Sequence, residues 1–433
     1  MLRLLIKELP NKVYETTQHE VLVQAHVHTL RKLGKMTFLV LRDRSGFCQA
    51  LVPFKLTETI NPQAVVEVIG KVNRHKESKY NGIEIYVTSI TTISKAEILP
   101  LAIHKPEPHS WHLQYQYRPL ALRQLEEIAI FKIQATMLNA YREYLTSQDF
   151  VEISSTKLSK SGIEGGSELF NVDFFDEKLF LTQSPQFYKQ MMVGSLERVF
   201  EIGKVYRAEG ANSNRHLAEY IGLDLEMGFI PNAKSVMDVE TAVLNHMFRE
   251  VFLKNSHELE ILNVKLNDFH YPGIIPTLHY KEVVEIFKTN YNIDIGMEGL
   301  NHAQEVQLGE YCQKEMNTDW VFIYPYPTHL RPFYAMPCQD DETYSETFEL
   351  LYKGLEVTSG GQRIHDYEML VKRIVAKNLN PASFESYLMP FKYGMPLHGG
   401  FGIGLERIMM QMLNLHSVEV ASLIPRTNTR FLH

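Results

Sequence analysis

Apolar and polar residues alternate in several short runs within the first hundred residues of the chain. In one run Val21, Val23, Ala25 and Val27 are separated by mostly polar neighbours. Side chains of a strand point alternately to its two faces, so a period of two indicates a strand with one buried face. The pattern predicts five short strands, at residues 18–30, 36–42, 47–53, 64–72 and 83–90.

Five strands in so short a stretch suit an OB barrel, whose exposed face binds single-stranded nucleic acid. Residues 1–100 carry 14 Lys+Arg against 9 Asp+Glu, although the whole chain has a net charge of −7. A basic barrel can meet a phosphate backbone. On the second strand Phe38, Val40 and Arg42 share a face, and taken alone Phe38 is best explained as a residue of the barrel core.

The strand pattern is lost between residues 96 and 125, which include Pro100, Pro106, Pro108 and Pro119. Residues 126–146 then show a helical period with an apolar stripe. We therefore expect a barrel domain at 1–102, a hinge at 103–125 and one large α+β domain at 126–433. Within the last, residues 232–330 mix helical and loop patterns and are expected to include an insertion.

The stretch from Arg198 to Ile230 reads as strand, polar loop and strand. In its second arm four apolar residues alternate with Asp224 and Glu226, which places the two carboxylates together on the face away from the core. Arg207, Glu209, Arg215 and His216 crowd around the turn. Donors beside acidic groups suit a polar anionic ligand such as ATP, although a solvated hairpin tip explains the same charges.

A glycine-rich segment near the C-terminal end, His398 to Leu413, reads HGGFGIGLERIMMQML. Its glycines allow close backbone approach, and a helical pattern follows with Arg407 in the first turn. A strand that opens into a helix in this way can hold an anion at the helix N-terminus. The spacing matches neither the dinucleotide fingerprint nor a P-loop.

Composition narrows the class of protein. The 433 residues are 45% hydrophobic and 22% charged, which is typical of a globular chain. No apolar run approaches a membrane span, and the first residues lack the features of a signal peptide. Cys48, Cys312 and Cys338 are odd in number and widely spaced. They suit a reducing compartment, so we expect a cytoplasmic protein without disulfides, zinc or membrane partners.

The stretches Arg198 to Ile230 and His398 to Leu413 together closely resemble motifs 2 and 3 of class II aminoacyl-tRNA synthetases. The matching residues are VYRAE (Val205 to Glu209) with RHLAEY (Arg215 to Tyr220), and GIGLER (Gly402 to Arg407). Further matches are EGGSELF, LTQSPQFYKQ, RPFYAMP and GLEVTSGGQRIHDYE. The resemblance covers nearly the whole chain and is strongest to short aspartyl-tRNA synthetases, whose relatives are the asparaginyl enzymes. It implies an antiparallel sheet flanked by helices, behind an OB-fold anticodon-binding domain.

The resemblance also implies roles for individual residues in ATP binding. Arg207 would bridge the α-phosphate and the attacking carboxylate, and Arg407 would hold the terminal phosphates. The ATP-binding residues implied in this way are Arg207, Glu209, Arg215, His216, Leu217, Tyr220, Glu356, Gly404, Leu405, Glu406 and Arg407. Glu356 and Ser359 would bind Mg²⁺, a hard cation that prefers oxygen ligands.

Aspartate would be selected by Lys189 and Arg363, which match the family positions that clamp its β-carboxylate. Two cations favour a carboxylate over a neutral amide, because a buried charge without a partner is costly. The aspartate-binding residues implied by the resemblance are Glu164, Gln186, Lys189, Arg207, Asp224, Ser359 and Arg363. Of these, Glu164, Gln186 and Asp224 resemble the residues that hold the α-ammonium group and close the flexible loop. The expected reaction ligates L-aspartate to tRNA through an aspartyl-adenylate. The alternatives are an asparaginyl-tRNA synthetase and a non-catalytic RNA-binding relative.

The same resemblance reverses the interpretation of Phe38, which would stack on an anticodon base while Gln49 reads another. The implied anticodon residues are His28, Phe38, Gln49, Lys79 and Glu84. Strictly discriminating relatives tend to have Trp where His28 falls, which favours an enzyme that accepts both tRNA(Asp) and tRNA(Asn). Lys79 favours strict reading, so the two residues conflict.

The sequence departs from the family pattern in motif 1 and in its last ten residues. Motif 1 normally ends in a proline at the dimer interface, and here Thr156 takes that place in FVEISSTKL. We still expect a homodimer, with altered local geometry at that interface. The terminal IPRTNTRFLH also lacks the usual acidic residue after Pro-Arg.

Overall fold

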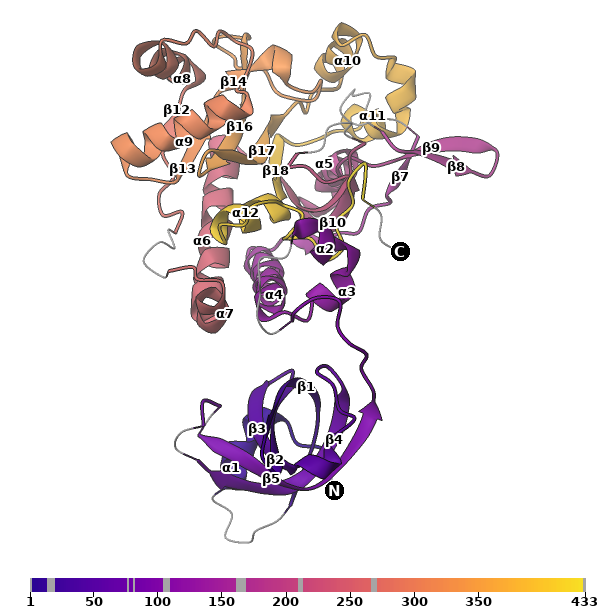
Figure 1. Cartoon of the computed structure of the whole chain (residues 1–433). Coiled ribbons are helices and arrows are strands. Elements are labelled where there is room, and N and C mark those ends of the chain that lie inside the picture. Colours follow the sequence, from indigo (N-terminus) through magenta and orange to yellow (C-terminus); the bar gives the residue numbers. More distant parts are fainter. Residues whose placement is uncertain are drawn as a thin grey trace. The chain divides into compact units, whose positions relative to one another are not determined.

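The computed structural model describes residues 2–13, 20–75, 78–80, 82–103, 110–160, 169–208, 213–265 and 271–430. The chain divides into two compact units, Met1–Leu125 and Glu126–His433, and both are visible in Figure 1. Among the described residues, no helix combines the length and the apolar character needed to cross a membrane.

The first unit is built around a closed five-stranded barrel with the strand order β1-β2-β3-β5-β4. Its strands are β1 (Val21–Leu33), β2 (Met36–Asp43), β3 (Gly46–Pro53), β4 (Val65–Arg74) and β5 (Ile83–Ser94), and a short helix α1 (Leu9–Lys12) precedes them. All five predicted strands are confirmed. Strands β3 and β5 pair in parallel, and the antiparallel pairing of β1 with β4 completes the ring.

The barrel core follows the predicted alternation. Val23, Val27, Leu39 and Val66 are fully buried and belong to one apolar cluster inside the barrel. Phe38 is only half-buried and lies outside that cluster. Placing Phe38 in the core was therefore wrong, because its neighbours Thr37 and Leu39 face inward and a strand residue between them must face outward.

The segment interpreted as a hinge contains two short helices, α2 (Trp111–Gln116) and α3 (Arg118–Ala121). Its prolines suggested irregular chain, but Pro119 lies in the first turn of α3, where a helix tolerates the missing N–H. Leu101, Ile103 and Ala121 form a small apolar cluster there.

The second unit has an eight-stranded sheet in the order β12-β13-β16-β17-β18-β11-β10-β6. The inner strands pair antiparallel, as expected, whereas β12 with β13 and β6 with β10 pair in parallel at the two edges. The strands of this unit are β6 (Val151–Glu152), β7 (Leu158–Ser159), β8 (Asn171–Phe174), β9 (Glu177–Leu181), β10 (Arg198–Tyr206), β11 (Glu219–Gly228), β12 (Thr277–Leu278), β13 (Trp320–Ile323), β14 (Tyr326–Pro327), β15 (Tyr344–Ser345), β16 (Thr347–Tyr352), β17 (Leu355–Arg363) and β18 (His398–Gly404).

Helices pack against this sheet, and α5, α6 and α12 contact its central strands, as Figure 1 shows. The helices are α4 (Leu125–Ser147), α5 (Gln186–Leu196), α6 (Lys234–Lys254), α7 (Ser256–Ile261), α8 (Tyr280–Ile286), α9 (His302–Met316), α10 (Tyr367–Ala376), α11 (Glu385–Lys392) and α12 (Leu405–Met412). The predicted stripe of α4 is confirmed, since Ile130, Ile133, Met137 and Tyr141 are buried.

The segment of motif 1 runs from β6, an edge strand of the large sheet, to β7 in a separate three-stranded sheet. Thr156, which stands where the family has proline, is exposed, and its hydroxyl accepts a hydrogen bond from the Leu158 backbone nitrogen at 3.2 Å. Ser155 next to it donates to the Glu201 carboxylate at 2.6 Å. The threonine therefore shapes a local turn through its side chain, as short polar residues commonly do.

Candidate active site

A cavity of about 560 Å³ opens over the central strands of the second unit. Strands β10, β11, β17 and β18 form its base, and α5, the first turn of α12 and residues 330–335 form its walls. Polar groups from segments far apart in the sequence meet here, as expected for a binding site.

Most of the residues expected to bind ATP or aspartate line this cavity. They are Gln186, Lys189, Arg207, Arg215, His216, Leu217, Tyr220, Asp224, Glu356, Ser359, Arg363, Gly404, Glu406 and Arg407. Leu405 is fully buried at the start of α12 and is not one of the lining residues. Glu164 and Glu209 lie outside the described residues.

At one end, buried cations and carboxylates alternate. The Lys189 amine is 3.0 Å from Asp224 Oδ1 and 3.5 Å from Glu226 Oε2, and it also donates to the Phe401 carbonyl at 2.9 Å. Arg363 donates to Glu226 Oε1 at 3.0 Å and to the Gly400 carbonyl at 2.8 Å. Two cations and two carboxylates thus form one paired network at the base of the cavity.

The burial of the two carboxylates corrects the sequence interpretation. Asp224 and Glu226 do face away from Leu223 and Leu225, as the alternation predicted. However, Asp224 is only 5% exposed and Glu226 is 0% exposed, because β11 pairs with both β10 and β18 and α5 covers this face. Burial raises the pKa of the Asp224 carboxyl above its ordinary value, and Lys189 opposes that shift.

At the other end, cations from motifs 2 and 3 gather around Glu356. Arg407 donates to the Glu356 carbonyl at 2.9 Å and to its carboxylate at 3.3 Å, and it reaches the Arg215 carbonyl at 3.3 Å. Burial, with Arg407 and two further arginines nearby, lowers the pKa of His216 to about 4. This end is therefore a concentration of positive charge in which His216 is neutral at pH 7.

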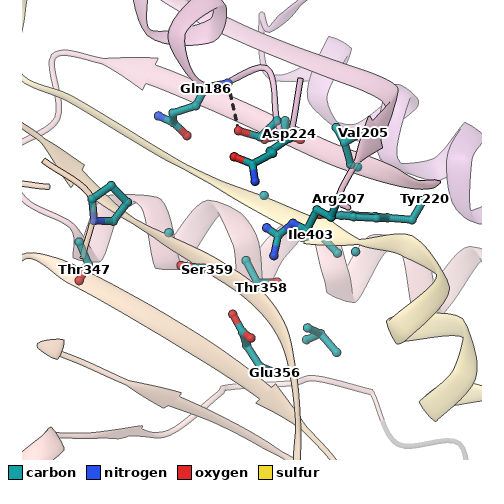
Figure 2. A pocket seen from close by; sticks show the side chains of 18 of the residues that line it. Gln186, Val205, Arg207, Tyr220, Asp224, Thr347, Glu356, Thr358, Ser359 and Ile403 are labelled. Carbon is teal, nitrogen blue, oxygen red and sulfur yellow. Dashed lines mark hydrogen bonds between the residues drawn. The ribbon is translucent and has the colours of Figure 1, made fainter. Parts of the chain in front are cut away.

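Arg207 lies between the two ends. Figure 2 shows its side chain with Gln186 and Asp224 on one side and Glu356 on the other. Its guanidinium carbon is 5.9 Å from the centre of the Tyr220 ring. A planar cation at this place can contact two anionic groups at once.

The sequence did not identify three charged residues beside this site. Arg331 lines the cavity, where it donates to Glu349 Oε1 at 2.9 Å and to the Ser359 hydroxyl at 3.3 Å. Glu305 on α9 is 3.3 Å from Arg215. Arg331 lies within the quoted RPFYAMP match, which was the available signal. Glu305 and Glu349 reach the site only through tertiary packing.

Glu406 lines the cavity but is engaged with the backbone. Its two carboxylate oxygens both accept from the Ile221 backbone nitrogen at 3.1 Å. Burial raises its pKa to about 7. Glu406 therefore ties α12 to β11 next to the position expected for the nucleotide.

The expected anticodon residues lie on the barrel. His28 is 7% exposed at a break in the β1–β2 register, with its ring 5.0 Å from that of Phe47. Gln49 donates to Glu84, which is itself buried. Phe38 is half-buried and Lys79 is exposed. The ring centres of Phe47 and Tyr80 are 5.9 Å apart, so an aromatic series runs from His28 to Tyr80, the residue after Lys79.

Comparison with known families agrees with this geometry. Residues 110–428 match the family model of tRNA synthetases class II (D, K and N). Residues 21–93 match the OB-fold nucleic acid binding domain. The first match covers the cavity and all its lining residues, and the second covers the barrel.

Individual relatives span nearly the whole chain. An aspartate–tRNA(Asp/Asn) ligase of Thermus thermophilus is 40% identical and covers 99% of both chains. An aspartate–tRNA(Asp) ligase of Pyrococcus abyssi is 37% identical over 96% of this chain and 97% of its own.

Solved structures are similar over the same length. An asparaginyl-tRNA synthetase of Pyrococcus horikoshii with asparaginyl-adenylate has a TM-score of 0.89 at 28% identity, covering 97% of this chain and 99% of its own. A putative aspartyl-tRNA synthetase of Leishmania major has a TM-score of 0.89 at 29% identity, covering 99% and 94%. The chain therefore belongs to the class II tRNA synthetases of the D, K and N group and is an aminoacyl-tRNA synthetase with an N-terminal OB-fold domain.

Proposed function

We propose that this enzyme activates L-aspartate with ATP and transfers it to tRNA(Asp). In the first step a carboxylate oxygen of aspartate attacks the α-phosphorus, the bond to the β-phosphate breaks, and pyrophosphate leaves. In the second step the terminal hydroxyl of the tRNA attacks the carbonyl of the adenylate, and AMP leaves. Both steps bring anions together, so positioning and neutralisation of charge dominate catalysis.

The cavity divides these tasks between its two ends. Arg207, at the centre, contacts the α-phosphate and the attacking carboxylate. Arg407, Arg215 and His216 hold the terminal phosphates, while Tyr220 stacks on adenine. The observation that supports this division most directly is that Arg407 donates to Glu356 and to the Arg215 backbone carbonyl, with His216 within electrostatic reach of all three.

Selection of aspartate rests on Lys189 and Arg363. Both cations are already paired with Asp224 or Glu226, and neither has room to leave the base of the cavity because both are at most 5% exposed. Asparagine offers a neutral amide that cannot replace a carboxylate in such a network. The function of an asparaginyl-tRNA synthetase is therefore less favoured, although a solved asparaginyl-tRNA synthetase is similar in fold.

Magnesium fits the residues at the phosphate end. Glu356 lines the cavity with a side chain that is 31% exposed, and Ser359 lines the same cavity with its hydroxyl. Mg²⁺ usually takes one or two carboxylates together with phosphate oxygens and water, and the described residues hold no cluster of three metal-binding side chains. Glu356 and Ser359 would hold the ion, which would supply neutralisation of the phosphate charge.

A pyrophosphate-exchange assay with each amino acid tests the proposal. Exchange should depend on aspartate and be lower by about a hundredfold or more with asparagine. Exchange with asparagine alone would refute it. Arg207→Ala should abolish exchange with the fold retained, as judged by circular dichroism. A non-catalytic role would predict no exchange in the wild type, and the presence of Arg207, Arg407 and Glu356 on one cavity disfavours it.

We further propose that the barrel binds the anticodon and that the enzyme also charges tRNA(Asn). Phe38, Gln49 and Glu84 supply a stacking surface and hydrogen-bonding groups, and His28 stands where strict enzymes carry a larger ring. The two anticodons differ at one base. Discrimination needs a contact that one base satisfies and the other leaves unpaired, worth about 1–3 kcal/mol.

Charging of purified transcripts of both tRNAs tests this second proposal. Comparable kcat/KM values for the two tRNAs are expected. A preference of about a hundredfold for tRNA(Asp), equivalent to about 2.7 kcal/mol, would overturn it and indicate Lys79 as the decisive residue.

The enzyme is also proposed to be a homodimer in the cytoplasm. The motif 1 segment supports the first point, because Val151 is 44% exposed at the sheet edge. The free thiols Cys48, Cys312 and Cys338 support the second. Light scattering at micromolar concentration tests the dimer, and cell fractionation tests the location.

A further inference from the structure

A chain of buried hydrogen bonds lies directly behind the aspartate end of the cavity. It joins α5 to α11 and β18 through Gln186, Gln190, Tyr387 and His398, which are each at most 5% exposed. Gln186 lines the cavity and Gln190 does not. The roles proposed so far involve Gln186 only.

The direction of these hydrogen bonds is fixed from one end. A backbone carbonyl only accepts, so His398 Nδ1 must donate to the Pro396 carbonyl at 2.8 Å. Burial lowers the pKa of His398, and a neutral imidazole that donates through Nδ1 can only accept through Nε2. Gln190 must therefore donate its amide nitrogen to His398 Nε2, at 3.1 Å. The polarity of the Gln190 amide follows from this network.

The oxygen of the Gln190 amide then fixes the orientation of the Gln186 side-chain amide. Gln190 Oε1 accepts from the Tyr387 hydroxyl at 3.1 Å and from Gln186 Nε2 at 3.0 Å. Because Gln186 gives its amide nitrogen to Gln190, its amide oxygen is the end that remains for a ligand. Figure 2 shows Gln186 beside Asp224, on one side of Arg207.

We propose that Gln190 is a positioning residue for the α-ammonium group of the amino acid. It keeps the Gln186 oxygen, an acceptor, towards the ammonium group and prevents the amide from turning its NH₂ group there. A reversed amide would place two donors against a cation. The inference rests on the proposed function, since it assumes that aspartate occupies this end of the cavity.

Gln190→Met tests the proposal, because methionine keeps the length and volume of the side chain without its hydrogen bonds. The wild type and the variant are compared in pyrophosphate exchange, with succinate as competitive inhibitor. Succinate is aspartate without its amino group. The variant should raise KM for aspartate about ten- to a hundredfold, the range for a hydrogen bond to a charged group. KM for ATP and Ki for succinate should stay within about threefold of the wild type.

A double-mutant cycle with Gln186→Met adds a second readout. If Gln190 acts through Gln186, substitution of Gln190 should raise KM for aspartate little further when Gln186 is already methionine. Because Gln190 is fully buried, Tyr387→Phe is measured in parallel. This substitution removes one hydroxyl. It should weaken the binding of aspartate by a few fold without weakening the binding of succinate.

The outcomes distinguish a failure of the role of Gln190 from a failure of the proposed function. If either variant weakened the binding of aspartate and of succinate equally, the site would be distorted as a whole, and the proposed role of Gln190 would be overturned. Full additivity in the double-mutant cycle would also overturn it. Both results leave the proposed function intact. A wild-type enzyme without aspartate-dependent exchange would instead refute the proposed function, and this inference with it.

Discussion

At the scale of single residues, the part of the aspartate end that the structure describes pairs two buried cations with two buried carboxylates. Lys189 and Arg363 are paired with Asp224 and Glu226. Burial alone would lower the pKa of Arg363, but the nearby Glu226 carboxylate reverses this, so that the pKa is raised. Substrate aspartate thus enters a site whose cations are already held in place.

Replacement of Lys189 by methionine should remove most aspartate activation. The variant loses a partner for the substrate carboxylate and leaves Asp224 with an uncompensated charge, which costs about 3–5 kcal/mol for a buried pair. Aspartate-dependent exchange should fall by about a hundredfold or more, with ATP affinity by calorimetry within about twofold.

The control for that variant is Lys254→Met, which removes an exposed lysine paired with Glu250 at 2.7 Å. It should leave exchange and stability unchanged, because exposed pairs contribute little. Near-normal exchange in the Lys189 variant would contradict the proposed selector.

A second residue-scale prediction concerns Glu240 on α6, which is 0% exposed. Burial raises its pKa from 4.5 to about 8. Between these values the unfolded chain is ionised and the folded chain keeps the proton. The contribution of Glu240 to the free energy of unfolding should therefore fall by about 1.4 kcal/mol per pH unit in this window.

Glu240→Gln should remove that dependence. Denaturant unfolding at several pH values from 5 to 8.5 should show a variant that gains stability relative to the wild type as the pH rises. Exposed Glu385→Gln is the matched control and should follow the wild type. A difference between wild type and Glu240→Gln that does not change with pH would refute the assignment.

At the scale of elements, strand β18 has two kinds of glycine. A Cβ atom added to Gly400 would overlap the Leu225 carbonyl oxygen and the Glu226 carboxylate. At Gly404 the nearest atom is Arg407 Cδ at 3.7 Å, an ordinary contact. Gly400 therefore serves the packing of β18 against β11, and Gly404 leaves open the space expected for the nucleotide.

Alanine at these two positions should separate stability from binding. Gly400→Ala should lower the unfolding temperature by several degrees and displace Glu226 from Arg363, because the overlap is with backbone and a buried side chain. Gly404→Ala should keep the unfolding temperature and raise KM for ATP. Thermal unfolding and exchange kinetics measure both. Equal losses of stability would contradict the distinction.

The same elements show what the sequence could predict. Period-two alternation was enough to identify the barrel strands and the second arm of the β10–β11 hairpin. The first arm was identified by its β-forming residues, and the glycines marked the start of α12. Local patterns could not reveal that the polar face of β11 is buried, because that depends on pairing with β18 and on α5. They also missed β6 and β12, which are two residues long, and the acidic residues Glu305 and Glu349, which tertiary contacts bring to the site.

At the scale of the whole molecule, the two units have separate apolar cores. The barrel core draws only on residues from Ile6 to Val87 and their packed neighbours. A second core around Leu308 and Tyr280 belongs to the catalytic unit. Damage to one core should therefore act first on the function of its own unit.

Leu39→Ala should separate the two partial reactions. Leu39 is fully buried in the barrel, and its truncation should cost about 2–5 kcal/mol of stability. Charging of tRNA should be lost at a lower temperature than in the wild type, whereas exchange without tRNA should persist. Leu308→Ala, at a fully buried site in the other core, should lower both activities together. If the Leu39 variant lost tRNA charging and exchange at the same temperature, the two units would unfold as one.

The paired charges at the base of the cavity also constrain how this enzyme can change under selection. Any single exchange that removes Lys189, Arg363 or Glu226 leaves the buried network with one uncompensated charge. Intermediates on a mutational path towards a neutral substrate would thus be both unstable and inactive. Variants that accept an amide side chain should arise from paired substitutions of one cation and one carboxylate, with strong epistasis between them.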